Sequence, residues 1–149
     1  MENKLFKTLL EFSQKSPTLC LSTCSQDGQP QSSLIYFAMD EKASIYFFSK
    51  EETHKCLNIA KNPKVALLGQ DPQEQLTLQM EGVATKVVDQ KEIRFVFDLM
   101  MKNLSQRIDW PPPAAKIQAG DLVFYRVDLT WARLGHFKGH EKDIFTQLK

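Results

Sequence analysis

The chain has 149 residues, of which 42% are hydrophobic and 25% are charged, a composition typical of a single soluble globular domain. Its 19 basic and 18 acidic side chains leave a net charge of +1, without the basic block expected of a nucleic-acid-binding protein. No apolar run approaches the roughly 18 residues of a membrane helix, and the N-terminal residues lack the apolar core of a secretory signal. We therefore expect a cytoplasmic protein that binds neither membranes nor nucleic acid.

The spacing of apolar residues predicts the elements in chain order. Helices are expected where apolar residues recur at helical spacing, at residues 2–15, within 50–62 and at 89–104. Strands are expected where apolar and β-branched residues alternate between turn residues, at residues 18–25, 31–40, 44–49, 64–69, 76–88 and 121–137, the last as one long or two short strands. The short connections indicate antiparallel pairing. The fold class expected is mainly β (α+β): one domain over residues 1–149, with an antiparallel sheet of six or seven strands closing into a barrel, flanked by helices.

Several residues have a predicted structural role within these elements. Gly82 is expected to form a bulge or bend in the fifth strand, and the proline triplet 111–113 is expected to form a loop. The residues expected on the apolar helix faces are Leu5, Leu9, Phe12, Cys56, Leu57, Ala60, Ile93, Val96, Phe97, Met100 and Leu104. The three cysteines, Cys20, Cys24 and Cys56, are an odd number and are interpreted as buried thiols, not as a disulfide framework.

The start of the second helix, in FFSKEETHKCLNIAKNP (residues 47–63), allows two interpretations. Ser49 and Glu52 fit the S-x-x-E capping box, which needs no ligand. The same helix start could instead hold a phosphate, because its free N–H groups carry partial positive charge and Thr53, His54 and Lys55 add donors. Glu51 and Glu52 would then have to point away. Neither G-x-G-x-x-G nor G-x-x-x-x-G-K-[ST] occurs, so a phosphate site would be of another kind.

An ordered set of motifs over residues 16–90 resembles the pyridoxamine 5′-phosphate oxidase-like family. The matching features are the D-G-x-P turn, the F-F-S strand, T-H-K at the helix start, N-P-x-V-A before the next strand and a late E-G. The resemblance implies a split β-barrel that binds FMN. It also implies a small flavin oxidoreductase, in which the flavin transfers hydride or electrons and the protein orients it.

The resemblance assigns particular residues to the cofactor. The phosphate grip falls on Ser49, Thr53, His54 and Lys55, with Phe48 beside it, and the strand along the flavin ring falls on Ser33, Leu34, Ile35 and Tyr36. The family's dimer places the flavin in a groove between two chains, and Thr77 stands where the partner subunit reaches it. We therefore expect a homodimer that also binds a small-molecule substrate.

This chain departs from the family's pattern at charged positions. Ser33 and Ala38 replace an arginine and a lysine of the oxidase strand, and His54 replaces an arginine. Because each charged hydrogen bond contributes about 1.5–3 kcal/mol, FMN binding is expected to be weaker than in the oxidase. Arg133 and His136 are the candidate substrate-binding residues near the C-terminus, but their spacing matches the oxidase imperfectly, which argues against pyridoxamine phosphate oxidation.

Alternatives remain open at this point. His136 and His140 form H-x-x-x-H, which could serve a heme, as in some split-barrel relatives, although the nearby glycines argue against the helix that would align them. Trp110 and Trp131 could stack on a flavin, although such residues are more often packed in a core or interface. A flavin-binding or flavin-free module without turnover is the other alternative. No metal site is predicted, and G-x-S-x-G is absent, which argues against a hydrolase.

Overall fold

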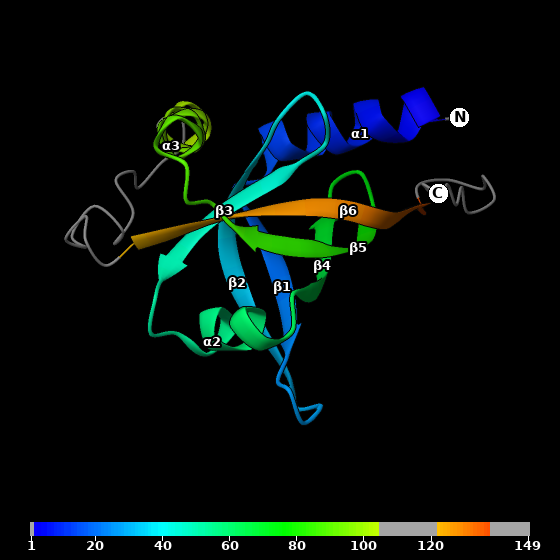
Figure 1. The fold of residues 1–149 in the computed structure, drawn as a ribbon. Helices are drawn as coiled ribbons and strands as arrows, with labels where there is room; N and C mark the ends of the chain where they lie inside the picture. Colours follow the sequence, from blue (N-terminus) through cyan, green and yellow to red (C-terminus); the bar gives the residue numbers. More distant parts are fainter. Residues whose placement is uncertain (1, 105–121, 138–149) are drawn as a thin grey trace.

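The computed structural model describes residues 2–104 and 122–137. Its elements in chain order are α1 (Glu2–Lys15), β1 (Thr18–Cys24), β2 (Pro30–Met39), β3 (Ile45–Lys50), α2 (His54–Lys61), β4 (Lys64–Asp71), β5 (Leu76–Lys86), α3 (Gln90–Leu104) and β6 (Leu122–His136) (Figure 1). The predicted proline loop, Trp110 and His140 lie outside the described residues. None of the described helices is long and apolar enough to cross a membrane.

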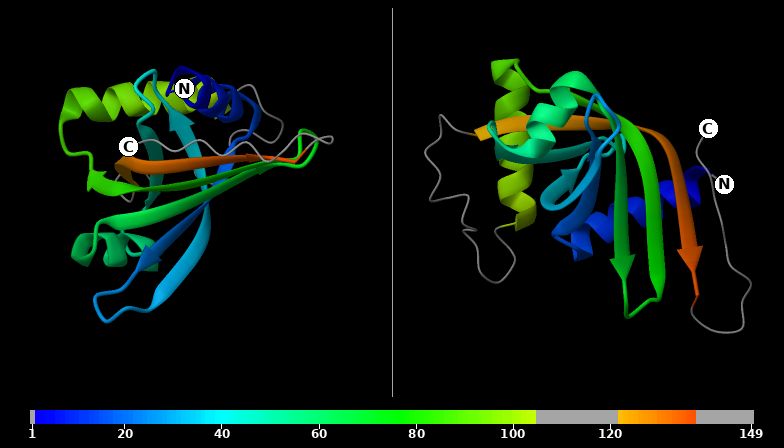
Figure 2. Two further views of the ribbon diagram at one scale, coloured as in Figure 1. Left: turned by 90° about the vertical axis from the view of Figure 1, so that its right-hand side faces the viewer. Right: turned by 90° about the horizontal axis from the view of Figure 1, so that it is seen from below.

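The six strands close into an antiparallel barrel in the order β1-β2-β3-β6-β5-β4. This confirms the predicted mainly β barrel of six or seven strands, with six strands in the described part of the chain. The three helices lie outside the barrel wall, with α1 and α3 towards one end and α2 towards the other (Figures 1 and 2). The C-terminal strand is one long element that pairs with β3 through its first half and with β5 along most of its length.

Gly82 lies at the predicted irregularity, but the extra residue is Thr130 of β6, since Glu81 pairs with Trp131 and Gly82 with Leu129. The register between β5 and β6 shifts between Glu81 and Gly82. A Cβ atom at Gly82 would lie 2.7 Å from the carbonyl oxygen of Asp128, so no larger side chain fits without moving the backbone of β6. The glycine therefore permits the close approach that lets the two longest strands bend around the barrel.

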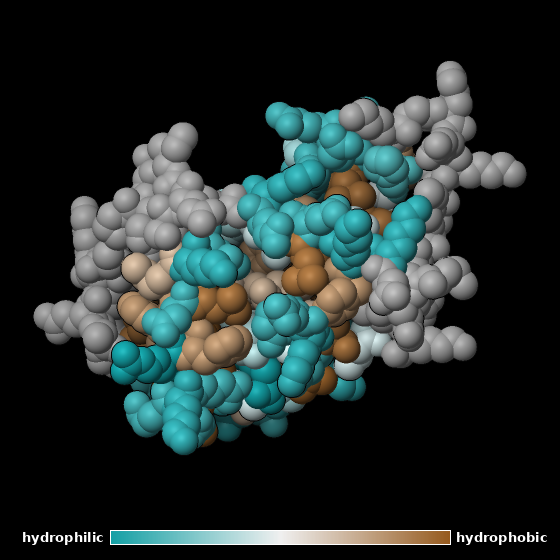
Figure 3. Space-filling view, turned by 90° about the horizontal axis from the view of Figure 1, so that it is seen from above, coloured by the Kyte–Doolittle hydropathy of each residue, from teal (hydrophilic) through white to brown (hydrophobic). Residues whose placement is uncertain are grey.

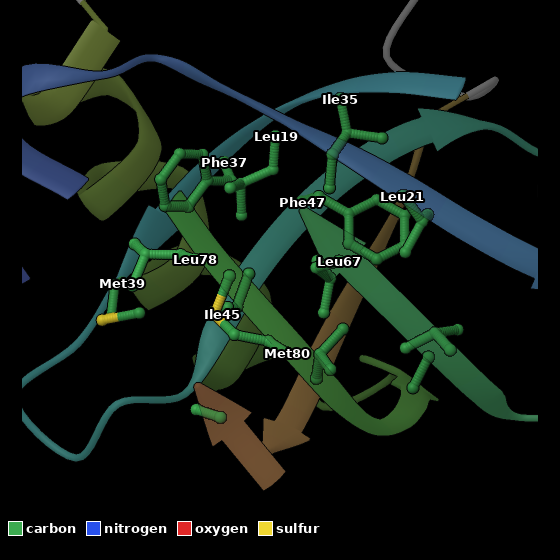
Figure 4. Packing of buried hydrophobic residues seen from close by; sticks show 14 of the residues in the cluster. Leu19, Leu21, Ile35, Phe37, Met39, Ile45, Phe47, Leu67, Leu78 and Met80 are labelled. Atoms are coloured by element: carbon green, nitrogen blue, oxygen red, sulfur yellow. The ribbon is translucent and has the colours of Figure 1, made fainter. Parts of the chain in front are cut away.

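The barrel interior is filled by alternate residues of the strands, as the two-residue period of a strand requires. Figure 4 shows this packing, in which side chains from β1, β2, β3, β4 and β5 point towards a common centre: Leu19, Leu21, Ile35, Phe37, Met39, Ile45, Phe47, Leu67, Leu78 and Met80. Helix α1 adds Leu5, Leu9 and Phe12 to the same cluster, as predicted. A second cluster lies under α3 and includes Val96, Met100 and Leu104.

Three predicted helix and cysteine assignments are wrong. Helix α2 buries Cys56 and Ile59, whereas Leu57 is 58% exposed and Ala60 is also exposed. Residues 56 and 59 share a face at helical spacing, and this face, not the one through Leu57, meets the barrel.

In α3, Phe97 is exposed beside the buried Val96. Cys20 and Cys24 are only half-buried, because they alternate with inward-facing residues of β1. All three cysteines are free.

Candidate functional site

The turn from β3 into α2 is held by one carbonyl oxygen. Lys50 O accepts hydrogen bonds from Thr53 Oγ1 at 2.9 Å and from Cys56 Sγ at 3.2 Å. The hydroxyl oxygens of Ser49 and Thr53 lie 3.1 Å apart. Ser49 is thus brought to the helix start as predicted, but as a buried residue of β3.

The predicted capping box is absent, because the helix begins later than the sequence pattern suggests. Thr53 is the N-cap residue and makes no side-chain capping hydrogen bond; its hydroxyl is directed back to Lys50 O, to which it donates. Ser49 lies four residues before the N-cap, and Glu52 precedes it in the turn. The first turn of α2 therefore lacks a side-chain cap.

This uncapped helix start has the electrostatic character of an anion site. The first helical bond is donated by Leu57 N–H to Thr53 O at 3.0 Å, so the amides of the three preceding residues have no partner within the helix. No acidic residue lies in the first turn. Glu51 forms an ion pair with Lys86 of β5 at 3.1 Å, so its carboxylate is paired with a lysine and not with the helix end. The partial positive charge of the helix end is consequently left for another anion.

The two cationic candidates of this helix differ in their surroundings. Lys55 is half-buried, and no carboxylate among the described residues forms an ion pair with it. His54 is exposed and lines a hollow of about 390 Å³ between α2 and the β1–β2 hairpin. Asn58 Nδ2 donates to Thr23 Oγ1 at 3.1 Å, which fixes α2 against β1 beside that hollow.

The barrel is split next to this helix, between β2 and β3. Only Phe37–Met39 of β2 pair with β3, whereas Pro30–Tyr36 pair with β1 alone among the described strands. Phe37 N–H donates to Pro17 O on the β1 side. In an antiparallel strand the backbone N–H and C=O groups of successive residues point to opposite sides. The backbone groups of Leu34 and Tyr36 therefore face away from β1, towards the split. This stretch therefore offers backbone donors and acceptors that no described strand pairs, and α2 lies beside β2 (Figure 1).

The predicted flavin strand presents different side chains on its two faces. Ile35 is buried inside the barrel, whereas Leu34 is 71% exposed and Tyr36 is also exposed. Ser33 shares the inward face of Ile35, because residues two apart on a strand point the same way. Phe48 lies on β3 with its ring 6.4 Å from that of Phe124, in the cluster under α3.

Thr77, Arg133 and His136 lie together, but far from the helix start. Thr77 pairs with Gly135, and its neighbour in β5 pairs with His136. Thr77 and Arg133 line a small hollow of about 210 Å³. Lys86, which contacts Glu51 beside α2, is nine residues further along β5, which is roughly 30 Å measured along the strand at about 3.4 Å per residue. Within one chain, these residues are therefore far from the predicted phosphate-binding residues at the start of α2. Trp131 is half-buried in the same strand.

The sequence patterns do not identify two buried polar groups near α2. The phenol of Tyr125 stacks under Phe47, with ring centroids 5.1 Å apart. Burial raises the pKa of Tyr125, and a hydrogen bond with Cys56 adds to the effect, so this phenol stays neutral beneath the helix. The second group is the side chain of Gln31, which lines the same hollow as His54. A strand glutamine carries no sequence signal of a site.

A larger hollow lies elsewhere on the molecule. It has a volume of about 940 Å³ and lies between α1, α3 and the β2–β3 turn, with Leu10, Tyr46 and Phe95 among its lining residues. Figure 3 looks onto this side and shows apolar patches broken up by hydrophilic side chains. None of the predicted site residues lines it.

Comparison with known proteins decides the family. The family model described as pyridoxamine 5′-phosphate oxidase matches residues 5–135. The chain belongs to the pyridoxamine 5′-phosphate oxidase family. The match covers β1 to β5 and all but the last residue of β6, the strand on which the sequence motifs are weakest.

The curated relatives match only part of this chain. The pyridoxine/pyridoxamine 5′-phosphate oxidase of Colwellia psychrerythraea is 35% identical over 69 residues, which are 46% of this chain and 32% of that protein. The matched stretch thus spans about a third of this curated relative. Pyridoxamine 5′-phosphate oxidase family membership by itself leaves the reaction of this chain open.

Solved structures with the same fold include heme proteins. The heme storage protein of Vibrio cholerae has a TM-score of 0.64 at 21% identity, over 83% of this chain and 88% of that chain. A heme binding protein of Mycobacterium smegmatis has a TM-score of 0.69 at 14% identity, over 95% of this chain and 57% of that chain. At these identities the likeness shows the fold alone.

Proposed function

We propose that this chain is a cytoplasmic flavin-dependent oxidoreductase that binds FMN where β3, α2 and the open edge of β2 meet. The observations that carry the proposal are the uncapped start of α2 and the stretch Pro30–Tyr36 of β2, which pairs with β1 but not with β3; α2 and the beginning of this stretch line one hollow. A phosphate needs donors and positive charge, whereas the polar edge of an isoalloxazine needs donors and acceptors in alternation. Both requirements meet here, and family membership supports the pairing.

The residues of this chain fit FMN in distinct roles. The amides at the start of α2, the hydroxyls of Ser49 and Thr53, and the ammonium of Lys55 would hold the phosphate, with His54 as an additional donor. Within the predicted stretch from Ser33 to Tyr36, the backbone groups of Leu34 and Tyr36 would hold the ring. When bound, FMN supplies the hydride or electron transfer, and the protein orients the ring and excludes water.

The affinity is expected to be lower than that of a full oxidase site. Ser33 and Ala38 carry no charge, and Ala38 is fully buried in the cluster under α3. The phosphate then depends on Lys55 and the helix end, with weaker help from His54. Binding in the micromolar range corresponds to about 8 kcal/mol, which these contacts can supply without the two missing cations.

A homodimer completes the site in this proposal. Leu34, Cys20 and Leu68 are cross-strand neighbours on the outer face of the barrel, and Leu34 and Leu68 are 71% and 50% exposed. Cross-strand neighbours share a face, so they form an apolar patch suited to a second copy. Thr77, with Arg133 and His136 nearby for a small-molecule substrate, would then reach the flavin of the partner subunit.

A heme protein on the same fold is the second candidate. The heme proteins among the structural neighbours favour it. His136 is half-buried on β6 and would be the axial ligand within the described residues. His54 cannot be its partner on one iron within a chain, because α2 and the end of β6 lie at opposite ends of β5.

The first experiment is a titration of dialysed protein with FMN, followed by quenching of flavin fluorescence. Saturation near one FMN per chain supports the proposal, and a subsequent screen of electron donors and acceptors tests turnover. A heme titration in the same buffer, read at the Soret band, tests the second candidate. Absence of FMN binding up to high micromolar concentration, together with saturable heme binding, would replace the first candidate by the second. Binding without turnover of any donor would leave a flavin-binding module.

A further inference from the structure

Gln31, the second residue of β2, carries a buried polar atom without a hydrogen-bond partner among the described residues. Its side-chain oxygen Oε1 is shielded from solvent and makes no hydrogen bond. Buried side-chain polar atoms nearly always have a partner, and leaving one unsatisfied costs stability. Among the described residues, it is the one buried side-chain oxygen or nitrogen that lacks a hydrogen-bond partner.

The location of Gln31 connects this atom with the proposed cofactor site. Gln31 is one of the residues that line the hollow of about 390 Å³, together with His54, Leu57 and Asn58 of α2. Gln31 and Ser33 point to the same face of β2, since they are two residues apart. Ser33 is the position where the oxidase strand has a phosphate-binding arginine. On this face, Gln31 is thus the longer polar side chain beside a shortened position.

We propose that Gln31 is a cofactor-binding residue that forms a hydrogen bond with a hydroxyl of the ribityl chain of the flavin. The role rests on the proposed function, since it concerns the same site. A ribityl hydroxyl both donates and accepts, so it satisfies the carboxamide in either orientation of its oxygen and nitrogen. A phosphate oxygen only accepts and would leave Oε1 unsatisfied. The polyol between the phosphate at α2 and the ring along β2 is therefore the matching part of FMN.

The test uses the full-length protein with three flavins. FMN carries the ribityl chain and the phosphate, riboflavin carries the ribityl chain alone, and lumiflavin carries neither. The variant Gln31→Met keeps the length of the side chain and removes its hydrogen-bonding groups. We expect it to weaken FMN and riboflavin by the same factor, about fivefold for one neutral hydrogen bond, and to leave lumiflavin binding unchanged. Gln73→Met, at an exposed residue of the β4–β5 turn, is the matched control and should change none of the three.

A stability measurement separates ligand binding from a structural role. Because Gln31→Met removes an unsatisfied acceptor, the flavin-free variant should unfold at the same denaturant concentration as the wild type or at a higher one. A variant that binds FMN as tightly as the wild type overturns the role of Gln31 while the proposed function stands. A fivefold loss that also affects lumiflavin would overturn it too, because the damage would then be to the fold. A wild type that binds no flavin would overturn both.

Discussion

The hydroxyl oxygens of Ser49 and Thr53 lie 3.1 Å apart and join the end of β3 to the start of α2. Thr53→Val keeps the shape of the side chain and removes the hydrogen bond to Lys50 O. We expect the free energy of unfolding to fall by about 1 kcal/mol and FMN binding to weaken, as measured by urea denaturation and fluorescence titration. Thr53→Ser should retain both properties. Unchanged FMN affinity in Thr53→Val would remove this hydroxyl from the phosphate site.

Lys55 is the one full positive charge assigned to the phosphate. Lys55→Ala should weaken FMN by at least about tenfold, since a charged hydrogen bond contributes about 1.5–3 kcal/mol, and should leave riboflavin binding unchanged because riboflavin has no phosphate. Lys61→Ala, at the exposed far end of the same helix, removes the same charge as a control. If Lys55→Ala binds FMN as tightly as Lys61→Ala and the wild type do, the phosphate lies elsewhere.

The exposed leucines of the outer sheet test the proposed dimer. Leu34→Glu and Leu68→Glu each place a carboxylate in the apolar patch, so both should convert a dimer into monomers in light scattering. Leu57→Glu is the matched control, because Leu57 is similarly exposed at 58% but lies on α2. A wild-type chain that is monomeric at micromolar concentration would contradict the dimer directly. Dissociation caused only by the control would move the interface to α2.

Tyr46 makes stability depend on alkaline pH. Its hydroxyl donates to Asp40 Oδ2 at 3.0 Å, and burial, followed by this contact with Asp40, raises the pKa of Tyr46 to about 12. The unfolded chain ionises near pH 10. The folded state therefore binds the proton more tightly, so this contribution is complete below about pH 10 and is lost as the pH rises to about 12.

The variant Tyr46→Phe tests that relationship. It should lower the free energy of unfolding near neutral pH by about 1 kcal/mol through the lost hydrogen bond. It should also make the decline above pH 10 less steep, with the remaining decline due to the other buried phenol, Tyr125. The measurement is urea denaturation over a series of alkaline buffers. A decline as steep as that of the wild type would assign the effect to other groups.

The sequence predicts the strands well and the start of α2 poorly, for a physical reason. Alternation of apolar residues reports which strand faces are buried, and the barrel confirms it from Leu19 to Met80. A capping pattern reports only that two polar residues stand three apart. Here the hydroxyl that could cap the helix bonds Lys50 O, a preference set by the turn and not by composition.

Sequence patterns also do not predict the distance between the start of α2 and the group formed by Thr77, Arg133 and His136. Thr77 and Lys86 belong to the same strand, so their separation follows once β5 is assigned. That Lys86 meets Glu51 beside α2 depends on how β3, β6 and β5 are paired. The pairing also determines the split, since it ends contact between β2 and β3 at Phe37. Neither the strand pairing nor the split can be predicted from a single sequence.

The split in the barrel gives β2 two kinds of amide hydrogen. The amide of Ile35 is directed to β1 and is locked in the ladder, whereas those of Leu34 and Tyr36 face the gap. In the flavin-free protein, alternate amides along this one strand should exchange with deuterium at very different rates. A ligand that occupies the gap would slow the fast ones selectively. Exchange along β2 would thus report two properties at once. The slowly exchanging amides report whether the barrel is folded, and the rapidly exchanging amides report whether a ligand occupies the gap.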